Sequence, residues 1–369
     1  MSRGAFQARM GATLATDERS AVQEIRAQLD SPDAATVLVF CSNGYDLRRL
    51  GAELQSAFPG VVCGCTGAGQ IGPNGYQIGG LTAVSLSGDL RVTPYTLQPL
   101  QKLGTQEVTI RRALKASLGP QIVPGRAFGF VLIDGLSQKE ERVASSLHAV
   151  LGEIPMIGGS AGDHLGLRAT HVLTDDGFVE DAAVLLLFET SLPFRTFKVQ
   201  HFTPTSAVLV VTAAEPDRRV VTELNGKPAT EEYARLIGSS PGALDARLFS
   251  QHPVMLKVGD DHYVRSIQGV GEGGSLRFFC AIDEGLVLRL GRAEDIVEAT
   301  RRSFEAGYHP PELILGCDCV LRRLEVEERG LTARMNDLLV QSRVFGFCSY
   351  GEQYDGVHAN QTFTGIALG

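Results

Sequence analysis

The chain has 369 residues, of which 44% are hydrophobic and 21% charged, and its formal net charge is −8. This composition is typical of a folded protein with about two domains. The acidic balance argues against a nucleic-acid partner, which would require Lys and Arg gathered on one face. The first residues lack a signal peptide, and the longest apolar run, 182–188, is too short for membrane insertion. We therefore expect a cytoplasmic protein whose seven cysteines are reduced thiols.

Three segments of the chain repeat one pattern, at residues 36–69, 128–162 and 313–351. Each has an apolar strand, a polar turn, a helix with one apolar face, and a second apolar run that ends in small residues. This alternation indicates parallel strand pairs in sheets covered by helices. Because glycine allows a backbone to approach another group closely, we expect the three Gly-rich strand ends to meet around a shared cleft.

Strand-rich stretches separate these units, at residues 81–86, 182–188, 195–199, 207–212, 263–267 and 275–281. The turn-rich segment 213–217 lies near the middle of the chain, so we place a domain boundary near residue 222. The predicted fold class is α/β, with two lobes of mixed β-sheets flanked by helices. The lobes are expected at residues 1–222 and 223–369.

One glycine-rich motif, residues 67–72, matches the dinucleotide fingerprint G-x-G-x-x-G. That fingerprint needs a helix whose N-terminus faces the pyrophosphate. Here Pro73, Asn74 and Gly75 follow, so we predict that no helix begins and that no nucleotide binds.

A second motif, residues 158–162, matches the nucleophile pattern G-x-S-x-G with Ser160 at its centre. A hydrolase would need Ser160 on a sharp strand-to-helix turn, beside a base such as His164, His171 or His201. The residues after the motif resemble a loop, which favours close packing or ligand approach as the reason for the small residues. A serine hydrolase is the enzymatic alternative.

Cysteine pairs with C-x-C spacing occur at residues 63–65 and 317–319. Both thiols of a pair would lie on one strand face, but structural zinc sites usually space their ligands more widely. We expect buried thiols instead. Among the eight histidines, His201 leaves an apolar strand and His358 enters the last one, so these two are best placed to face a cleft. No C-x-x-C-H motif is present, which excludes a covalently attached c-type heme.

Further segments carry a resemblance to a known family. They are residues 134–137, 140–141, 154–163, 223–229, 233–234, 346–353 and 360–362. In this order they resemble the FIST family of bacterial sensory and signal-transduction proteins, across nearly the whole chain. The resemblance implies an N-terminal and a C-terminal FIST module that bind a ligand, without known catalytic residues, so we expect no enzyme.

Residues 200–204 and 316–319 are similar to a nitric-oxide-sensing subset of that family, which binds heme and regulates histidine kinases and cyclic-di-GMP signalling. For this chain, that likeness implies heme b as cofactor, nitric oxide as signal and a histidine kinase as protein partner. A b-type heme needs an apolar cleft and one or two imidazoles. We assign His201 and His358 as the candidate heme and metal ligands.

The second reading, implied by the family in general, is a sensor of amino acids or similar small polar ligands. In that case Ser160, Asp163, Glu352 and the Gly-rich strand ends would hold the ammonium and carboxylate groups of the ligand. The predicted ligand cleft comprises Gly158, Gly159, Ser160, Asp163, Tyr350 and Glu352. A homo-oligomer is left open.

Overall fold

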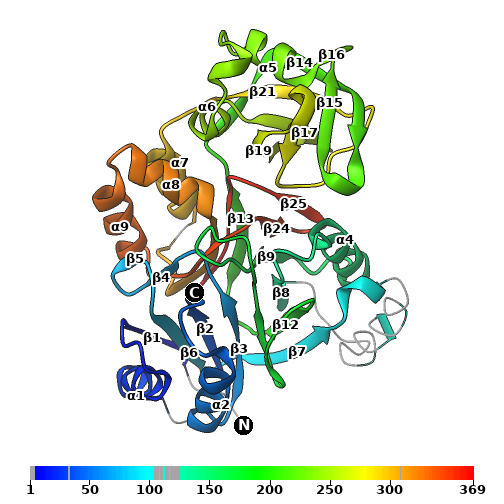
Figure 1. Cartoon of the computed structure of the whole chain (residues 1–369). Helices are drawn as coiled ribbons and strands as arrows, with labels where there is room; N and C mark the ends of the chain where they lie inside the picture. The colour runs from blue at the N-terminus through cyan, green and yellow to red at the C-terminus, as the bar shows by residue number, and fades with distance from the viewer. Residues whose placement is uncertain are drawn as a thin grey trace. The chain divides into compact units, whose positions relative to one another are not determined.

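A computed structural model describes residues 5–31, 34–103, 108, 111–112, 116, 125–307 and 309–369 (Figure 1). The chain forms two compact units. Unit 1 comprises Met1–Lys198, Arg301–His358 and Phe363–Gly369, and unit 2 comprises Val199–Thr300 and Ala359–Thr362. Both contain mixed sheets and helices, which confirms the predicted α/β class. The compact units do not follow one boundary near residue 222, because the chain leaves unit 1 at residue 198 and returns to it at residue 301.

The predicted repeat is confirmed in unit 1, and each copy is longer than expected because a two-stranded hairpin and a fifth strand complete it. The first copy contains β2 (Thr36–Cys41), α2 (Leu47–Ala57), β3 (Val61–Thr66), β4 (Gln70–Gly72), β5 (Gly75–Gln77) and β6 (Leu81–Ser87). The second contains β8 (Ala127–Ile133), α4 (Glu140–Leu151), β9 (Met156–Ser160), β10 (Val172–Thr174), β11 (Gly177–Val179) and β12 (Ala183–Glu189).

The third copy has two helices in place of one. It contains β22 (Leu313–Cys319), α8 (Val320–Glu328), α9 (Thr332–Gln341), β23 (Val344–Ser349), β24 (Glu352–Tyr354), β25 (Val357–Ala359) and β26 (Phe363–Leu368). The structure also describes β1 (Gln7–Thr13), α1 (Glu18–Leu29), β7 (Arg91–Leu97), a 3-10 turn at Leu100–Lys102, β13 (Phe194–Val199) and α7 (Ile296–Phe304), the last two of which cross between the units.

The three copies exchange their hairpins. The sheet orders are β1-β6-β2-β3-β10-β11, β7-β12-β8-β9-β24-β25 and β13-β26-β22-β23-β4-β5. In each sheet the first two strands of a copy are parallel, and its fifth strand runs antiparallel to the first. The hairpin at the end of each sheet comes from a different copy, so the first copy completes the third sheet, the second completes the first, and the third completes the second.

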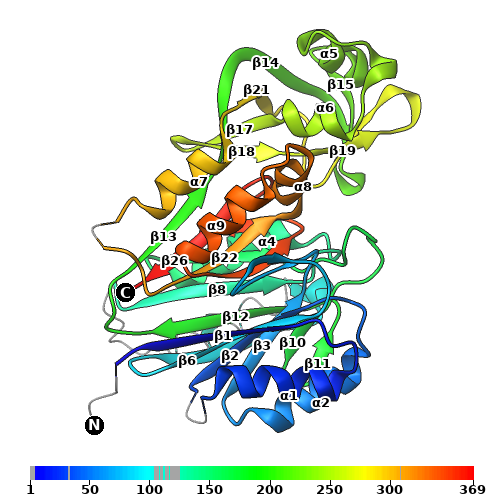
Figure 2. The ribbon, with the colours of Figure 1, turned by 90° about the vertical axis from the view of Figure 1, so that its left-hand side faces the viewer.

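The inner faces of the three sheets supply one apolar core. In β2, Leu38 and Phe40 face this core, and the ring of Phe40 stacks on that of Phe347 at 4.5 Å between centroids. The alternate residues of β2 face α1 and α2, which cover the outer face of the same sheet (Figure 2). Burial of each large apolar side chain contributes about 1.5–3 kcal/mol. Both faces of the central strands are therefore buried, and these strands consist of nearly continuous apolar residues.

Unit 2 contains an eight-stranded sheet with the order β18-β17-β21-β14-β15-β20-β19, in which β16 pairs with β15. Its elements are β14 (Phe202–Glu215), β15 (Val220–Leu224), β16 (Lys227–Pro228), α5 (Ala229–Leu236), α6 (Ala246–Gln251), β17 (Val254–Val258), β18 (Asp261–Arg265), β19 (Ile267–Val270), β20 (Leu276–Phe278) and β21 (Val287–Ala293), with 3-10 turns at Pro216–Arg218, Pro241–Ala243 and Glu272–Gly274. Tyr233 and Phe249 pack from α5 and α6 into the core of this sheet. Among the helices that the structure describes, none is long and apolar enough to cross a membrane.

A glycine occupies the same position in the second strand of each copy. These glycines are Gly64, Gly158 and Gly346, and each pairs with a residue of the parallel first strand. An added Cβ would lie 1.7, 2.0 and 1.8 Å, respectively, from a carbonyl oxygen of that first strand. The glycines predicted at the strand ends therefore have a packing reason, because backbone atoms occupy the space of a side chain.

Gly158→Ala is expected to lower the free energy of unfolding by about 1–3 kcal/mol or more, because the added methyl group overlaps the backbone of Val131. Gly44→Ala is the matched control, since its Cβ would meet an ordinary contact of 3.4 Å and the change should stay within about 0.5 kcal/mol. Denaturant titration of both variants measures the difference. Equal stabilities would contradict the close packing of the strand pair.

Candidate functional site

The three Gly-rich strand ends meet, as predicted, through backbone hydrogen bonds. Gly162 N–H donates to Thr66 O at 3.0 Å, and Tyr350 N–H donates to Ser160 O at 2.9 Å. The third link runs from Ala68 N–H to Cys348 O at 2.8 Å. Each strand end is thus bound by the next copy, and the three links form a closed cycle, which we call the strand-end ring.

The ring is packed closely where the sequence suggested a cleft. An added Cβ at Gly162 would lie 2.8 Å from the backbone nitrogen of Ala68 and 3.3 Å from the ring of Tyr350. At Gly159 it would lie 2.8 Å from the thiol sulfur of Cys317. Protein atoms therefore fill the space beside these glycines.

The strand-end ring gives a common reference from which the three hairpins can be aligned residue by residue. The first and third hairpins directly follow their ring residues, and in the second a loop separates Gly162 from the hairpin. In the first hairpin Ile71 lies opposite Tyr76, and in the second Leu173 lies opposite Phe178. Leu173 packs among buried apolar residues beneath α1 and α2, and Phe178 lies against the same cluster. The second copy thus satisfies the fold at this position with an apolar pair, whereas in the first copy the Tyr76 hydroxyl donates to the buried Asp318 carboxylate.

The third hairpin carries a polar pair at the same position. The side-chain nitrogen Nε2 of Gln353 lies 3.0 Å from Nδ1 of His358, and it also donates to Ser160 Oγ at 3.0 Å. Ser160 and Gln353 are 0% exposed and His358 is 2% exposed. We call Ser160, Gln353 and His358 the polar chain. Burying polar groups costs free energy unless they are hydrogen-bonded, and the second hairpin meets the same packing requirement with apolar residues.

The Gln353 amide has unused hydrogen-bonding capacity. Its Oε1 atom is buried and has no hydrogen-bond partner among the residues that the structure describes. An amide can also rotate by 180°, which would place Oε1 toward Ser160 and His358 and turn Nε2 to the other side. In both orientations one polar atom of Gln353 is available to a further group.

The predicted cleft residues lie close to the polar chain. Glu352 is fully buried opposite Gly159 in the β9–β24 pair and accepts a hydrogen bond from Ser349 Oγ. Gly158, in turn, lies opposite Gln353. The exchange of hairpins therefore brings together residues from two copies that are far apart in sequence.

Asp163 and Tyr350 also lie side by side, but the Asp163 carboxylate is engaged within the chain. The Tyr350 hydroxyl donates to Asp163 Oδ1, and the same carboxylate accepts from the backbone N–H groups of Leu167, Arg168 and Ala169. Burial raises the pKa of Asp163, but the hydrogen bonds from Tyr350 and the backbone outweigh it and hold the pKa below its usual value. Burial and the neighbouring Asp163 raise the pKa of Tyr350.

The two predicted heme ligands lie in different units. His201 belongs to unit 2, where it is 0% exposed, its ring lies 4.0 Å from that of Phe202, and its carbonyl accepts from Glu294 N–H. His358 belongs to unit 1. Neither unit contains both imidazoles. Within the described ranges, no group of three or more His, Cys, Asp or Glu side chains could hold a metal ion.

The other sequence motifs behave as predicted. Residues 67–72 lead into the strands β4 and β5 rather than a helix, so the dinucleotide fingerprint lacks its helix. A loop follows Ser160, which is therefore not on a strand-to-helix turn. All seven cysteines are buried thiols, and burial raises the pKa of Cys41, Cys63, Cys65, Cys317 and Cys348.

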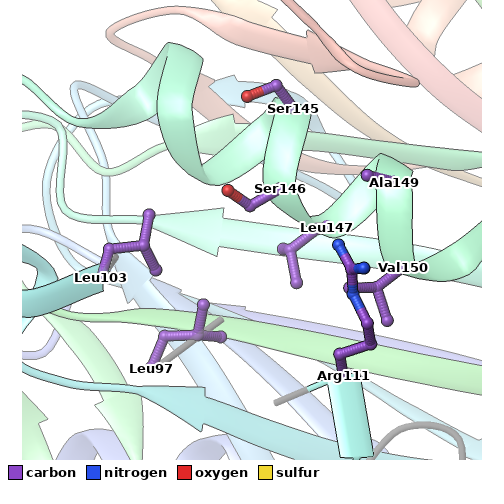
Figure 3. A pocket seen from close by; sticks show the side chains of 8 residues that line it. All are labelled: Leu97, Leu103, Arg111, Ser145, Ser146, Leu147, Ala149 and Val150. Atoms are coloured by element: carbon purple, nitrogen blue, oxygen red, sulfur yellow. The ribbon is translucent and has the colours of Figure 1, made fainter. Parts of the chain in front are cut away.

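One pocket of unit 1, of about 220 Å³, lies beside α4 and away from the predicted residues (Figure 3). Its lining includes Leu97, Leu103, Arg111 and Leu147, and none of the polar chain. In unit 2, an open pocket of about 500 Å³ lies along residues 268–272 and Arg277. Neither pocket contains a residue that the sequence singled out.

Sequence reasoning missed the role of Gln353. It was noted as part of a family-like segment, but its partners lie in another copy of the repeat and one strand away. Alignment of the three copies would have found it, because Ile71 and Leu173 stand at the equivalent positions.

Two family models match the chain. The FIST N domain matches residues 35–227, just over half of the chain, and the FIST C domain matches residues 229–355. A comparison with curated proteins found no match.

The double variant Gln353→Leu/His358→Phe copies the apolar pair of the second hairpin, Leu173 and Phe178. We expect it to be as stable as the wild type or more stable, because a buried polar pair is often neutral or costly relative to apolar residues of similar size. Gln353→Leu alone is expected to cost about 1–3 kcal/mol, since it removes the partner of His358 and of Ser160. Denaturant titration compares the two. If the double variant is less stable than Gln353→Leu, the polar chain stabilises the fold and needs no functional explanation.

Proposed function

Because this chain belongs to the FIST family of sensory and signal-transduction proteins, we propose that it binds a small polar ligand at the polar chain of unit 1. The observation that carries the proposal is the buried Ser160–Gln353–His358 chain, with a Gln353 oxygen that is unpartnered in the part of the chain that is described, at a position where the second copy of the repeat is apolar. Buried polar residues at a position where apolar residues would pack equally well are often explained by function. In this proposal the protein binds its ligand and catalyses no reaction.

The chemistry of the polar chain suits a ligand with both hydrogen-bond donors and acceptors, such as an amino acid. The amide of Gln353 offers one polar atom without a partner in the described structure, and leaving such an atom unsatisfied costs about 1–3 kcal/mol. A ligand that hydrogen-bonds to it recovers this free energy. A buried amide of this kind gives specificity, because a ligand analogue that lacks the group bound to Gln353 leaves the amide without a hydrogen-bond partner.

The output is proposed to pass through a protein partner. The two matched modules belong to a sensory family, and a histidine kinase in a cyclic-di-GMP pathway is the partner class that the family resemblance suggests. Ligand binding would shift the population of a contact-competent state by its difference in affinity for the two states.

A second candidate ligand is heme b, with nitric oxide as the signal. The observation in its favour is the contact between Nδ1 of the buried His358 and the Gln353 amide, since metal-ligating histidines are usually held by a hydrogen bond at their other ring nitrogen. With the amide rotated, Gln353 Oε1 accepts from Nδ1–H, which leaves Nε2 of His358 to hold the iron. His201 is the alternative ligand. The heme iron, when bound, supplies the site for nitric oxide.

A thermal-shift screen of amino acids tests the polar-ligand proposal. We expect at least one of them to raise the melting temperature of the wild type, and the Gln353→Leu/His358→Phe variant to lose that shift while remaining folded. His148→Phe, a change of an exposed residue on α4, serves as the matched histidine control and should keep the shift. The same shift in the double variant would place the site elsewhere. Labelling of Ser160 by a fluorophosphonate probe would point to a hydrolase instead.

An absorption spectrum of protein purified from heme-supplemented cells tests the second candidate. A Soret band that moves on reduction and on addition of nitric oxide is expected if heme binds, and His358→Ala should abolish it while His148→Ala keeps it. Loss of the band in His201→Ala alone would transfer the ligand role to His201. A protein that stays colourless after heme titration would rule out this candidate.

A further inference from the structure

Residues 163–170 are an insertion that the repeat does not require. In the first and third copies, the two ring residues that bind the neighbouring strand end are adjacent, at Ala68–Gly69 and Tyr350–Gly351. In the second copy the corresponding residues are Gly162 and His171, which both bond to Thr66. The hydrogen bonds of the ring therefore form without residues 163–170 in the other two copies, and the conformation of this segment needs a separate explanation.

The backbone of this segment is strained. His164, Leu165 and Leu167 have φ values of 57°, 69° and 50°, in the left-handed region that disfavours residues other than glycine. Each such residue costs about 1–2 kcal/mol, and strain of this kind persists only where the surroundings enforce it. The side chains of Leu165 and Leu167 are 45% and 44% exposed, so burial of these leucines does not supply the compensation.

A small set of hydrogen bonds enforces the strained conformation. The Asp163 carboxylate accepts from the N–H groups of Leu167 and Arg168 at 2.8 and 2.6 Å, and the Tyr350 hydroxyl accepts from Leu165 N–H at 2.9 Å. Tyr350 in turn donates to Asp163. We call Asp163 and Tyr350 the latch. Its two side chains come from two copies of the repeat. The end of the segment is held separately, because Asn43 Nδ2 donates to Ala169 O at 2.6 Å and the buried Thr170 hydroxyl donates to Asp134.

The latch lies next to the polar chain along the backbone. Tyr350 N–H donates to Ser160 O, and Ser160 N–H donates to the carbonyl oxygen of Gly351 at 2.8 Å. A group that binds Ser160 or Gln353 and displaces β9 relative to β24 therefore moves Tyr350 as well. Two-state elements of this kind convert a local shift into a larger one.

We propose that residues 163–170 form a strap with two states, latched as in this structure and released, and that the state of the polar chain sets the balance between them. The proposal rests on the proposed function for its ligand and adds the device that the ligand regulates. In the released state the strain in three residues is relieved and the leucines are free to move. Ligand binding at the polar chain then changes the exposure of the strap.

Trypsin cleavage after Arg168, an exposed residue of the strap, measures its release without any ligand. Tyr350→Phe removes the hydroxyl that holds Leu165 and Asp163, and we expect cleavage at this bond to become about tenfold faster. Tyr45→Phe is the matched control, because it removes a hydroxyl that bonds to Ala15 elsewhere in unit 1 and should leave cleavage after Arg168 unchanged. Cleavage of Tyr350→Phe at the wild-type rate would refute the latch.

Coupling to the polar chain is tested by the Gln353→Leu/His358→Phe variant, which leaves both latch residues in place. We expect its cleavage rate after Arg168 to differ from that of the wild type by threefold or more. An unchanged rate would mean that the strap does not sense the polar chain, whether or not a ligand is ever found. As a second readout, Leu165→Trp introduces one tryptophan, which can be excited selectively, into a chain that has none. Its emission should shift on Tyr350→Phe replacement, and identical spectra in the two backgrounds would also refute release.

Discussion

The fold of unit 1 depends on the closed cycle of backbone hydrogen bonds at the three strand ends. Each copy of the repeat gives its hairpin to the sheet of another copy, so a single copy leaves its own sheet edge unpaired. Buried backbone groups must find partners, and here they find them only when all three copies are in place. The glycines Gly64, Gly158 and Gly346 make this possible, because they let paired backbones approach to distances that exclude a side chain.

Because three copies satisfy one constraint, the places where they differ are informative. The apolar pair Leu173–Phe178 shows that packing alone does not select Gln353 and His358. The direct link between ring residues in two copies likewise shows that the segment 163–170 is not needed for closure. The polar chain and the segment 163–170 both contact Ser160 or Tyr350. The residues of the proposed sensing function therefore lie at one part of the ring. In a repeated fold, comparison of equivalent positions shows which residues the fold requires and which it does not require.

Several family-like residues of unit 2 have structural roles. Asn225 and Gly226 adopt left-handed φ values of 52° and 72° in the turn between β15 and β16, and the Asn225 amide donates to Glu232. Arg235, Asn225 and Lys227 lower the pKa of Glu232 to about 2, so this buried carboxylate is charged at neutral pH. Near the end of the chain, the Gln361 amide accepts from Ser266 Oγ and donates to the carbonyl of Ser250. These contacts stabilise turns and packing within the unit.

Local patterns in the sequence determined the repeated strand–helix–strand units, the buried thiols and the absence of a helix after residue 72, because periodicity and turn residues act over short distances. The tertiary structure alone decided which copy completes which sheet, and therefore that Gln353 meets Ser160 and that Tyr350 meets Asp163. It also placed His201 and His358 in different units, although both stand at strand ends in the sequence. These pairings join residues that are far apart in sequence. The partner of each strand edge is determined by the packing of all three sheets and not by residues close to it in sequence.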